Sequence, residues 1–274
     1  MFRWLKETSG SGFFRYGQTI NRRVQDGHKE HWLCPGCEDL FSGWETEFAN
    51  NVFHPLTSGK ASQFQYQEWL LKFAVSLSWR CLLHIRELSG LKHFSEELRQ
   101  EAERALYRWS EFLLGRQPDP GKYEQHLLPL DQIVDHTVTD MPPNINRYLL
   151  RSVEIDVACS DREAFVYVKL PYIFSIGFIN INRPGEWEGT KIQIRQGLLG
   201  SSEYSLPRSF LEYMMARARR MREIQETISD RQQETIKKSF LKNIDKLAES
   251  ETFKATHADV KLFGSDAFSQ SRKS

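Results

Sequence analysis

The sequence lacks a long apolar segment and an excess of charge of either sign, and these absences exclude two classes of protein. The most apolar stretch, residues 69–88, includes the ionisable side chains Lys72, Arg80, His84, Arg86 and Glu87. Burying those charges in a bilayer would cost too much free energy for a membrane span. The chain has 37 Lys and Arg against 36 Asp and Glu, so no global field attracts it to nucleic acid or membrane.

Cysteine is scarce too, with four residues in 274. Cys81 lies in an apolar run, and only Cys34 and Cys37 are close in sequence. The disulfide framework of a secreted protein would be denser, so we expect a reducing compartment. Residues 1–6 contain no apolar segment typical of a signal peptide, which favours a cytoplasmic protein.

Several catalytic motifs are absent as well. The sequence contains no Gly-rich phosphate loop, no G-x-S-x-G and no H-E-x-x-H string, so nucleotide hydrolysis and serine or zinc proteolysis lack support. The acidic residues Glu154, Asp156 and Glu163, with Lys169, invite comparison with metal-dependent nucleases. The spacing fails, because no acidic residue precedes a lysine by two positions on an expected strand.

The middle of the chain has the period of helices. Apolar residues within 64–115 indicate two helices, the first ending at Gly90 and the second capped by Ser95. A short helix is also expected over 38–50, after a strand that precedes Cys34. Residues 118–143 are rich in turn formers and predict a connector.

The remainder of the chain predicts a sheet followed by helices. Between 147 and 197, β-branched and aromatic residues alternate with polar ones, as in 191–194, which predicts an antiparallel sheet. Residues 207–249 return to a helical period, and 265–274 are expected to form a frayed tail. We therefore predict an α+β fold, with a region at 1–60 around the cysteine pair and an α+β body at 61–274.

Cys34-Pro35-Gly36-Cys37 is the motif with the clearest chemistry. The tight turn of a C-x-x-C brings both sulfurs to one side, and a helix that begins there favours the thiolate that zinc binds. Zinc needs four ligands, and this pair supplies two. The alternative is a pair of reduced structural thiols.

Two histidines precede the pair, giving H-x2-H-x2-C-x2-C. Residues three apart on a strand point to opposite faces, so at most one of His31 and His28 aims at the sulfurs. Either histidine is therefore a candidate zinc ligand, and the alternative is a half-exposed strand histidine.

The string from Glu30 to Glu45 resembles the helix half of a treble-clef zinc finger. It is similar to a group of bacterial proteins related to HNH (His-Me finger) endonucleases, with the pattern L-C-x-x-C-E-x-x-F-S-x-x-E and then V-F-x-P. The matching residues are Leu33, Cys34, Cys37, Glu38, Phe41, Ser42, Glu45, Val52, Phe53 and Pro55. The resemblance continues through 69–80, 120–124 and 146–151. It implies a treble-clef-like region at 1–60, degenerate in this chain, and DNA or RNA as a partner.

This sequence departs from such relatives at its beginning. They carry an upstream C-x-x-C and an S-H-I-I-P-like string just before a stretch that resembles residues 2–8. By resemblance, that hairpin supplies two zinc ligands and the histidine that activates water. We expect either that the true start lies upstream of Met1 or that this copy has lost the hairpin. Without that histidine, hydrolysis of the HNH type lacks its general base.

Two basic clusters are candidates for contact with phosphates. The first, Arg3, Lys6, Arg15, Arg22 and Arg23, is interleaved with aromatic residues, a pattern that suits stacking on bases. The second surrounds Arg217 and Arg220 on an expected helix, where Glu212, Glu223 and Glu226 predict ion pairs instead. The ordinary interpretation of both clusters is a packed or solvated surface.

These patterns leave two functional hypotheses. The first is an HNH-endonuclease-like nucleic-acid-binding protein, with zinc on Cys34 and Cys37 and with cleavage dependent on the absent hairpin. The second is a non-catalytic protein that binds a protein partner and retains the cysteine pair as a vestigial zinc knuckle.

Overall fold

The computed structural model describes residues 1–9, 11–24, 30, 32–200, 204–242 and 244–268, and the chain divides into two units. The first unit comprises residues 1–31, 131–152 and 208–274, and the second comprises 32–130 and 153–207. Both units contain segments from the predicted regions 1–60 and 61–274. Among the described helices, none has the length and apolar character needed to cross a membrane.

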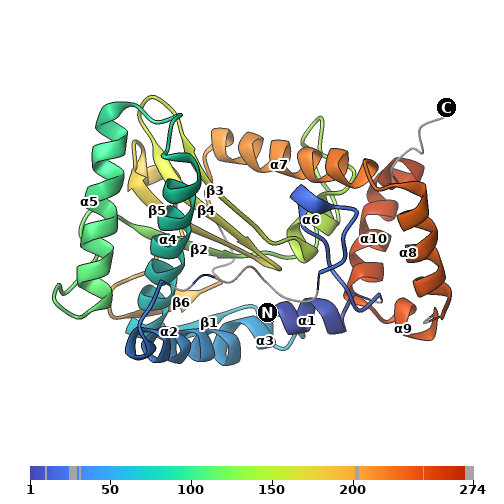
Figure 1. The fold of residues 1–274 in the computed structure, drawn as a ribbon, viewed down its shortest axis with the longest axis horizontal. Helices are drawn as coiled ribbons and strands as arrows, with labels where there is room; N and C mark the ends of the chain where they lie inside the picture. Colours follow the sequence, from blue (N-terminus) through green and yellow to red (C-terminus); the bar gives the residue numbers. More distant parts are fainter. Residues whose placement is uncertain (10, 25–29, 31, 201–203, 243, 269–274) are drawn as a thin grey trace. The chain divides into compact units, whose positions relative to one another are not determined.

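A four-stranded antiparallel sheet forms the centre of the second unit. The strands are β2 (Gln125–Pro129), β3 (Glu154–Cys159), β4 (Ala164–Leu170) and β5 (Ile173–Asn180), in the order β2-β5-β4-β3 (Figure 1). The two central strands are buried along almost their whole length. Their apolar residues therefore pack on both faces of the sheet, which confirms the predicted α+β class.

Helices pack on this sheet. α4 (Glu68–Ser89) lies across it and contacts every strand, and α5 (Glu96–Leu113) packs beside α4 (Figure 1). Gly90 ends α4 in the left-handed conformation, with φ +63°. The hydroxyl of Ser95 accepts the backbone N–H of Leu98 at 3.3 Å and caps α5. Both predicted helix signals are confirmed.

α4 approaches the sheet closely at one glycine. Gly177 of β5 lies under Ser78 of α4, and a Cβ at residue 177 would come within 2.2 Å of the Ser78 hydroxyl oxygen. That hydroxyl donates a buried 2.7 Å hydrogen bond to the side-chain carbonyl of Gln125, which pairs with Gly177 across β2 and β5. The absence of a side chain at 177 therefore sets the distance between helix and sheet.

The strand and helix boundaries differ from the predicted ones at several places. Residues 64–67, predicted as helix, form the strand β1 (Phe64–Gln67), because Phe64 and Tyr66 alternate with exposed glutamines. Its antiparallel partner is β6 (Gln196–Leu199), whereas the predicted strand at 191–194 provides only a bridge from Lys191 to His126. Strand β2 lies in the predicted connector.

The helix after the cysteine pair is longer than expected. α2 (Pro35–Phe48) continues through a π-helix at Ala49–Phe53 into α3 (His54–Thr57). α2 packs on α4, where the rings of Phe48 and Phe73 stack at 3.9 Å. The prediction of a strand before Cys34 is wrong at Trp32 and Leu33, which have no regular secondary structure.

The described part of the first unit is mainly helical. Its helices are α1 (Phe2–Glu7), α6 (Ile145–Arg151), α7 (Arg208–Glu226), α8 (Asp230–Lys242), α9 (Ile244–Ala248) and α10 (Glu251–Phe263), with short 3-10 turns at Gly17–Thr19 and Gly264–Ala267. Helix α6 replaces the start of the predicted sheet, and α10 was not predicted. The fully buried carboxylate of Asp259 joins these two helices, since it accepts the backbone N–H of Asn146 at 2.7 Å and Nε of Arg147 at 2.9 Å.

We expect Gly177→Ala to destabilise the protein by about 1–3 kcal/mol, because the added methyl group overpacks the contact between α4 and β5. Urea unfolding followed by circular dichroism measures the change. Gly43→Ala on α2 is the matched control, since nothing lies within 4 Å of its Cβ position and alanine favours helix by about 0.5–1 kcal/mol. Equal effects of the two substitutions would contradict this account.

Candidate functional site

The cysteine pair lies at the beginning of a helix. Cys34 is the N-cap of α2, and its carbonyl accepts the backbone N–H groups of Cys37 and Glu38, each at 3.0 Å. Pro35 occupies the first turn, where its missing N–H costs no hydrogen bond. Both cysteines are free thiols, and Cys34 is exposed whereas Cys37 is half-buried.

The two thiols interact with each other. The pKa of Cys34 is lowered, first by the backbone N–H of Cys37 and then by a hydrogen bond with the Cys37 side chain. The same side-chain hydrogen bond raises the pKa of Cys37. The two sulfurs therefore lie on the same side of the turn, as the spacing of the motif predicts. The first of them is better able to carry negative charge.

The further ligands of a zinc site are not defined by the structure. His28 and His31 lie outside the described residues. Across the described ranges, no group of three or more His, Cys, Asp and Glu side chains is arranged to hold a metal ion. Thiolates are ligands that zinc prefers, so the pair suits such an ion, and zinc binding stays a prediction.

Lys169 and the acidic residues of the sheet do not form a nuclease-like set. Glu154 stands opposite Lys169 in the pairing of β3 with β4. Lys169 is fully buried, its ammonium group donates to the carbonyl of Leu170, and it lies 5.3 Å from the Phe174 ring centroid. Burial holds the pKa of Lys169 well below its ordinary value. The lysine is thus part of the interior of the sheet.

A buried polar chain joins β2 to the loop that follows β5. His126 contacts the Thr190 hydroxyl at 2.7 Å through Nδ1 and the Glu124 carboxylate at 3.4 Å through Nε2, and Lys191 contacts Glu124 at 2.5 Å. A hydroxyl, an imidazole and a carboxylate in this order are the groups of a nucleophilic triad. However, Thr190 and His126 are both only 1 % exposed, and Thr190 donates to the Trp187 carbonyl at 3.0 Å. The chain of contacts therefore stabilises the fold.

The predicted basic residues at the N-terminus have different environments. Arg3 forms an exposed 2.8 Å ion pair with Glu7 on α1. Lys6 is half-buried and Arg22 is exposed. Arg23 lies over the Phe13 ring, with its guanidinium carbon 4.8 Å from the ring centroid.

Two of the N-terminal arginines lie close enough for their charges to interact. Phe14 and Val24 form an antiparallel bridge with backbone hydrogen bonds in both directions, and Arg15 and Arg23 adjoin this bridge on its two segments. The pKa of Arg15 is lowered, first by burial and then by the charge of Arg23. The guanidinium group of Arg15 donates to the Ile20 carbonyl at 2.7 Å and to the side-chain oxygen of Gln232 at 3.0 Å, both uncharged acceptors.

Most arginines of the second cluster are occupied by local contacts. Arg222 pairs with Glu226 at 3.2 Å, and Arg219 donates to the Asp140 carbonyl at 2.6 Å. Arg217 is half-buried over the Tyr213 ring, 5.9 Å from its centroid. Arg220 is exposed. The predicted ion pairing is thus present at Arg222, and Arg220 is the most accessible of the predicted pair.

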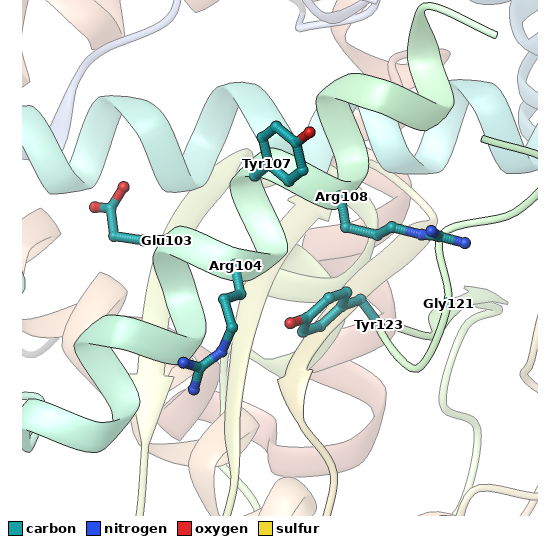
Figure 2. Close-up of a pocket in the computed structure, with 6 residues that line it drawn as sticks. All are labelled: Glu103, Arg104, Tyr107, Arg108, Gly121 and Tyr123. Carbon is teal, nitrogen blue, oxygen red and sulfur yellow. The ribbon is translucent and has the colours of Figure 1, made fainter. Parts of the chain in front are cut away.

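A shallow depression on α5 was not predicted. It has a volume of about 480 Å³ and is lined by Glu103, Arg104, Tyr107, Arg108, Gly121 and Tyr123 (Figure 2). Tyr107 is 68 % exposed, although it is a large aromatic residue. Arg108 is held by Asp119 at 2.9 Å and by Gln117 at 2.6 Å, so it offers a fixed planar surface more than a free charge. The helical period predicted that Tyr107 points away from the core, but not that loop residues near 121 complete a depression beside it.

Comparisons with models of protein families, with curated proteins and with solved structures find no match to this chain. The resemblance of residues 30–45 to HNH-related proteins therefore stays a prediction.

Glu124 gives a pH-dependent contribution to stability. The hydrogen bond with His126, followed by the contact with Lys191, lowers the pKa of Glu124 from 4.5 to about 2. A carboxylate with a lowered pKa stabilises the fold above pH 4.5, and this stabilisation is lost as the pH falls from 4.5 to about 2. We therefore expect Glu124→Gln to destabilise the protein at pH 7 and to have a much smaller effect near pH 2.5.

Unfolding in urea at a series of pH values tests this expectation. Glu188→Gln is the matched control. Glu188 is exposed, and its substitution removes the same charge from the same unit. A cost of Glu124→Gln that is independent of pH would show that its charge does not stabilise the fold.

Proposed function

We propose that the protein binds nucleic acid through the basic and aromatic surface of its first unit. The observation that carries the proposal is the placement of Arg15 and Arg23 on the two segments joined by the bridge between Phe14 and Val24, with Arg22 exposed beside Arg23. All three residues precede the cysteine pair in the chain and belong to the same unit as α7 and α8.

Like charges held near each other repel, and the charge of Arg23 lowers the pKa of Arg15. Among the described residues, no carboxylate forms an ion pair with Arg15 or Arg23, and the acceptors of Arg15 are uncharged. A phosphate between two guanidinium groups would accept charge-assisted hydrogen bonds from both and replace repulsion with attraction. The arrangement therefore suits an anion with oxygen acceptors, as found along a nucleic-acid backbone.

Aromatic rings adjoin these cations. Phe13 lies under Arg23, and Phe14 stacks on Phe2 at 5.4 Å and meets the edge of Tyr16 at 6.1 Å. Phe2, Phe13, Phe14 and Tyr16 are all half-buried, so part of each ring is accessible. Rings beside cations favour unpaired bases, which can stack while phosphates meet the arginines. We infer a preference for single-stranded DNA or RNA.

The resemblance to HNH-related proteins supports the same class of ligand. Cleavage of the HNH type would need, in addition, a histidine that activates water. The proposal concerns binding, which the described arginines and rings support without that histidine.

We expect Arg22→Gln with Arg23→Gln to weaken binding of a single-stranded oligonucleotide at least about tenfold and to lower the salt slope by about one to two. Fluorescence anisotropy at several salt concentrations measures both quantities. Lys60→Gln with Lys92→Gln removes the same charge from exposed residues of the other unit and serves as the control.

Flat anisotropy for the wild-type protein at micromolar concentration and low salt would remove the proposal. A plasmid incubated with the same protein and Mg²⁺, Mn²⁺ or Zn²⁺ tests for cleavage, and nicking that disappears in Cys34→Ser would add a nuclease activity to binding.

A second function, binding of a protein partner, is favoured by the depression on α5. Tyrosine and arginine are the residue types that contribute most to protein interfaces, and here Tyr107 projects beside the held side chain of Arg108. The depression is lined mainly by apolar atoms, and its cations are already paired with Asp119 and Glu101. These features suit a partner better than a phosphate.

For this second function we expect Tyr107→Ala to abolish the recovery of a specific partner with the tagged protein from its native cells, without loss of stability. Quantitative mass spectrometry of the recovered proteins, with thermal unfolding of each variant, measures both effects. Leu88→Ala is the control, because Leu88 is 70 % exposed on α4. Identical sets of proteins from wild type and Tyr107→Ala would exclude the depression as the interface.

A further inference from the structure

Cys34 and Cys37 together supply both protein sulfur atoms that an intramolecular disulfide needs. The two residues lie in the first turn of a helix of 14 residues, where the carbonyl of Cys34 accepts the backbone N–H of Cys37 at 3.0 Å. The side chain of Cys34 is exposed to solvent and that of Cys37 is half-buried behind it. A tetrahedral zinc site needs four ligands, whereas a disulfide needs only two adjacent sulfurs.

We propose that Cys34 and Cys37 form a redox-active dithiol that is converted to an intramolecular disulfide by exchange with small disulfides. The proposal rests on the position of the two sulfurs in the second unit. It is independent of nucleic-acid binding, which is assigned to arginines of the first unit.

The exchange takes two steps. The Cys34 thiolate attacks one sulfur of a small disulfide, an S–S bond forms between them, and the original S–S bond breaks to release a thiolate that takes up a proton. The Cys37 thiol then loses its proton to solvent and attacks the Cys34 sulfur, which releases the second small thiol. Two electrons and two protons pass from the cysteine pair to the small disulfide, and an excess of small thiol reverses both steps.

The structure assigns different roles to the two cysteines. Cys34 is the attacking residue because it is the exposed one, at the N-cap of α2. Cys37 is the resolving residue, since it is less accessible to a molecule in solution but lies in the same helical turn as Cys34. The other two cysteines lack such an arrangement. Cys81 is buried in α4, where burial raises its pKa to about 12, and the Cys159 thiol donates to the His93 carbonyl.

The charges near the pair indicate which disulfides react fastest. Glu38 and Asp39 directly follow Cys37 in the first turns of α2, and both are exposed. Two exposed carboxylates in the same part of α2 make the local potential more negative, which disfavours an anionic disulfide relative to a cationic one. We therefore infer a substrate class of cationic or neutral small disulfides, with cystamine as the representative cation and oxidised glutathione as the anion.

The test uses the full chain, reduced and treated with a chelator, and then mixed with cystamine or oxidised glutathione at low salt. Acid quenching, alkylation of the remaining thiols and mass spectrometry of the peptide containing residues 34–37 follow the reaction. For the wild type we expect loss of two hydrogen atoms from this peptide without an adduct. Cystamine should react about threefold faster than oxidised glutathione, and the difference should vanish at 1 M salt.

Variants separate the two roles. Cys37→Ser should stop at a mixed disulfide on Cys34, and Cys34→Ser should react at least about tenfold more slowly than Cys37→Ser. Cys159→Ser is the control and should behave as wild type. Glu38→Gln with Asp39→Asn should remove the preference for cystamine while keeping disulfide formation.

Three results would overturn the proposal. The first is a pair of separate adducts on residues 34 and 37 in the wild type, without an internal disulfide. The second is equal reactivity of Cys34→Ser and Cys37→Ser, with circular dichroism showing that both variants are folded. The third is one equivalent of zinc that remains after chelation and protects both thiols, which would assign the pair to a metal instead.

Discussion

The contact between Gly177 and Ser78 determines how the second unit is built. α4 reaches the sheet only because residue 177 has no side chain, and the hydrogen bond between Ser78 and Gln125 satisfies two polar groups that this close approach buries. α2 in turn packs on α4 through the stacked rings of Phe48 and Phe73 and through the 2.7 Å ion pair of Glu45 with Arg80. The position of Cys34 at the start of α2 therefore depends on a glycine in the sheet that it does not touch.

The sequence was sufficient to predict elements whose signals are local. The end of α4 at Gly90 and the start of α5 at Ser95 depend on backbone conformation and on a hydrogen bond three residues away, and both were expected. Strand β1 was missed because Phe64 and Tyr66 precede a helical apolar run, and only pairing with residues 196–199 distinguishes strand from helix there. Strand β2 was missed for a similar reason, since its burial comes from β5 and not from its own short pattern.

The same distinction between local signals and long-range contacts applies to the candidate sites. The interaction of Cys34 with Cys37 follows from a spacing of three residues, so the motif alone predicted that the sulfurs converge. The proximity of Arg15 to Arg23 requires the bridge between Phe14 and Val24, and the sequence indicated only that these arginines lie among aromatic residues. The depression beside Tyr107 requires the loop near residue 121 to return to α5, which no local pattern encodes.

The cysteine pair shows how one local geometry serves two chemistries. The helix N-terminus favours a thiolate at Cys34 whether the charge is then neutralised by a metal ion or used to attack a disulfide. The difference lies in what each reaction needs from the surrounding chain. A structural zinc site requires two more ligands around the same ion. Disulfide exchange requires only the two sulfurs, and the described turn leaves Cys34 exposed with Cys37 in the same helical turn. An accessible sulfur with a second thiol beside it is what exchange requires, and acidic neighbours at residues 38 and 39 then select the partner by its charge.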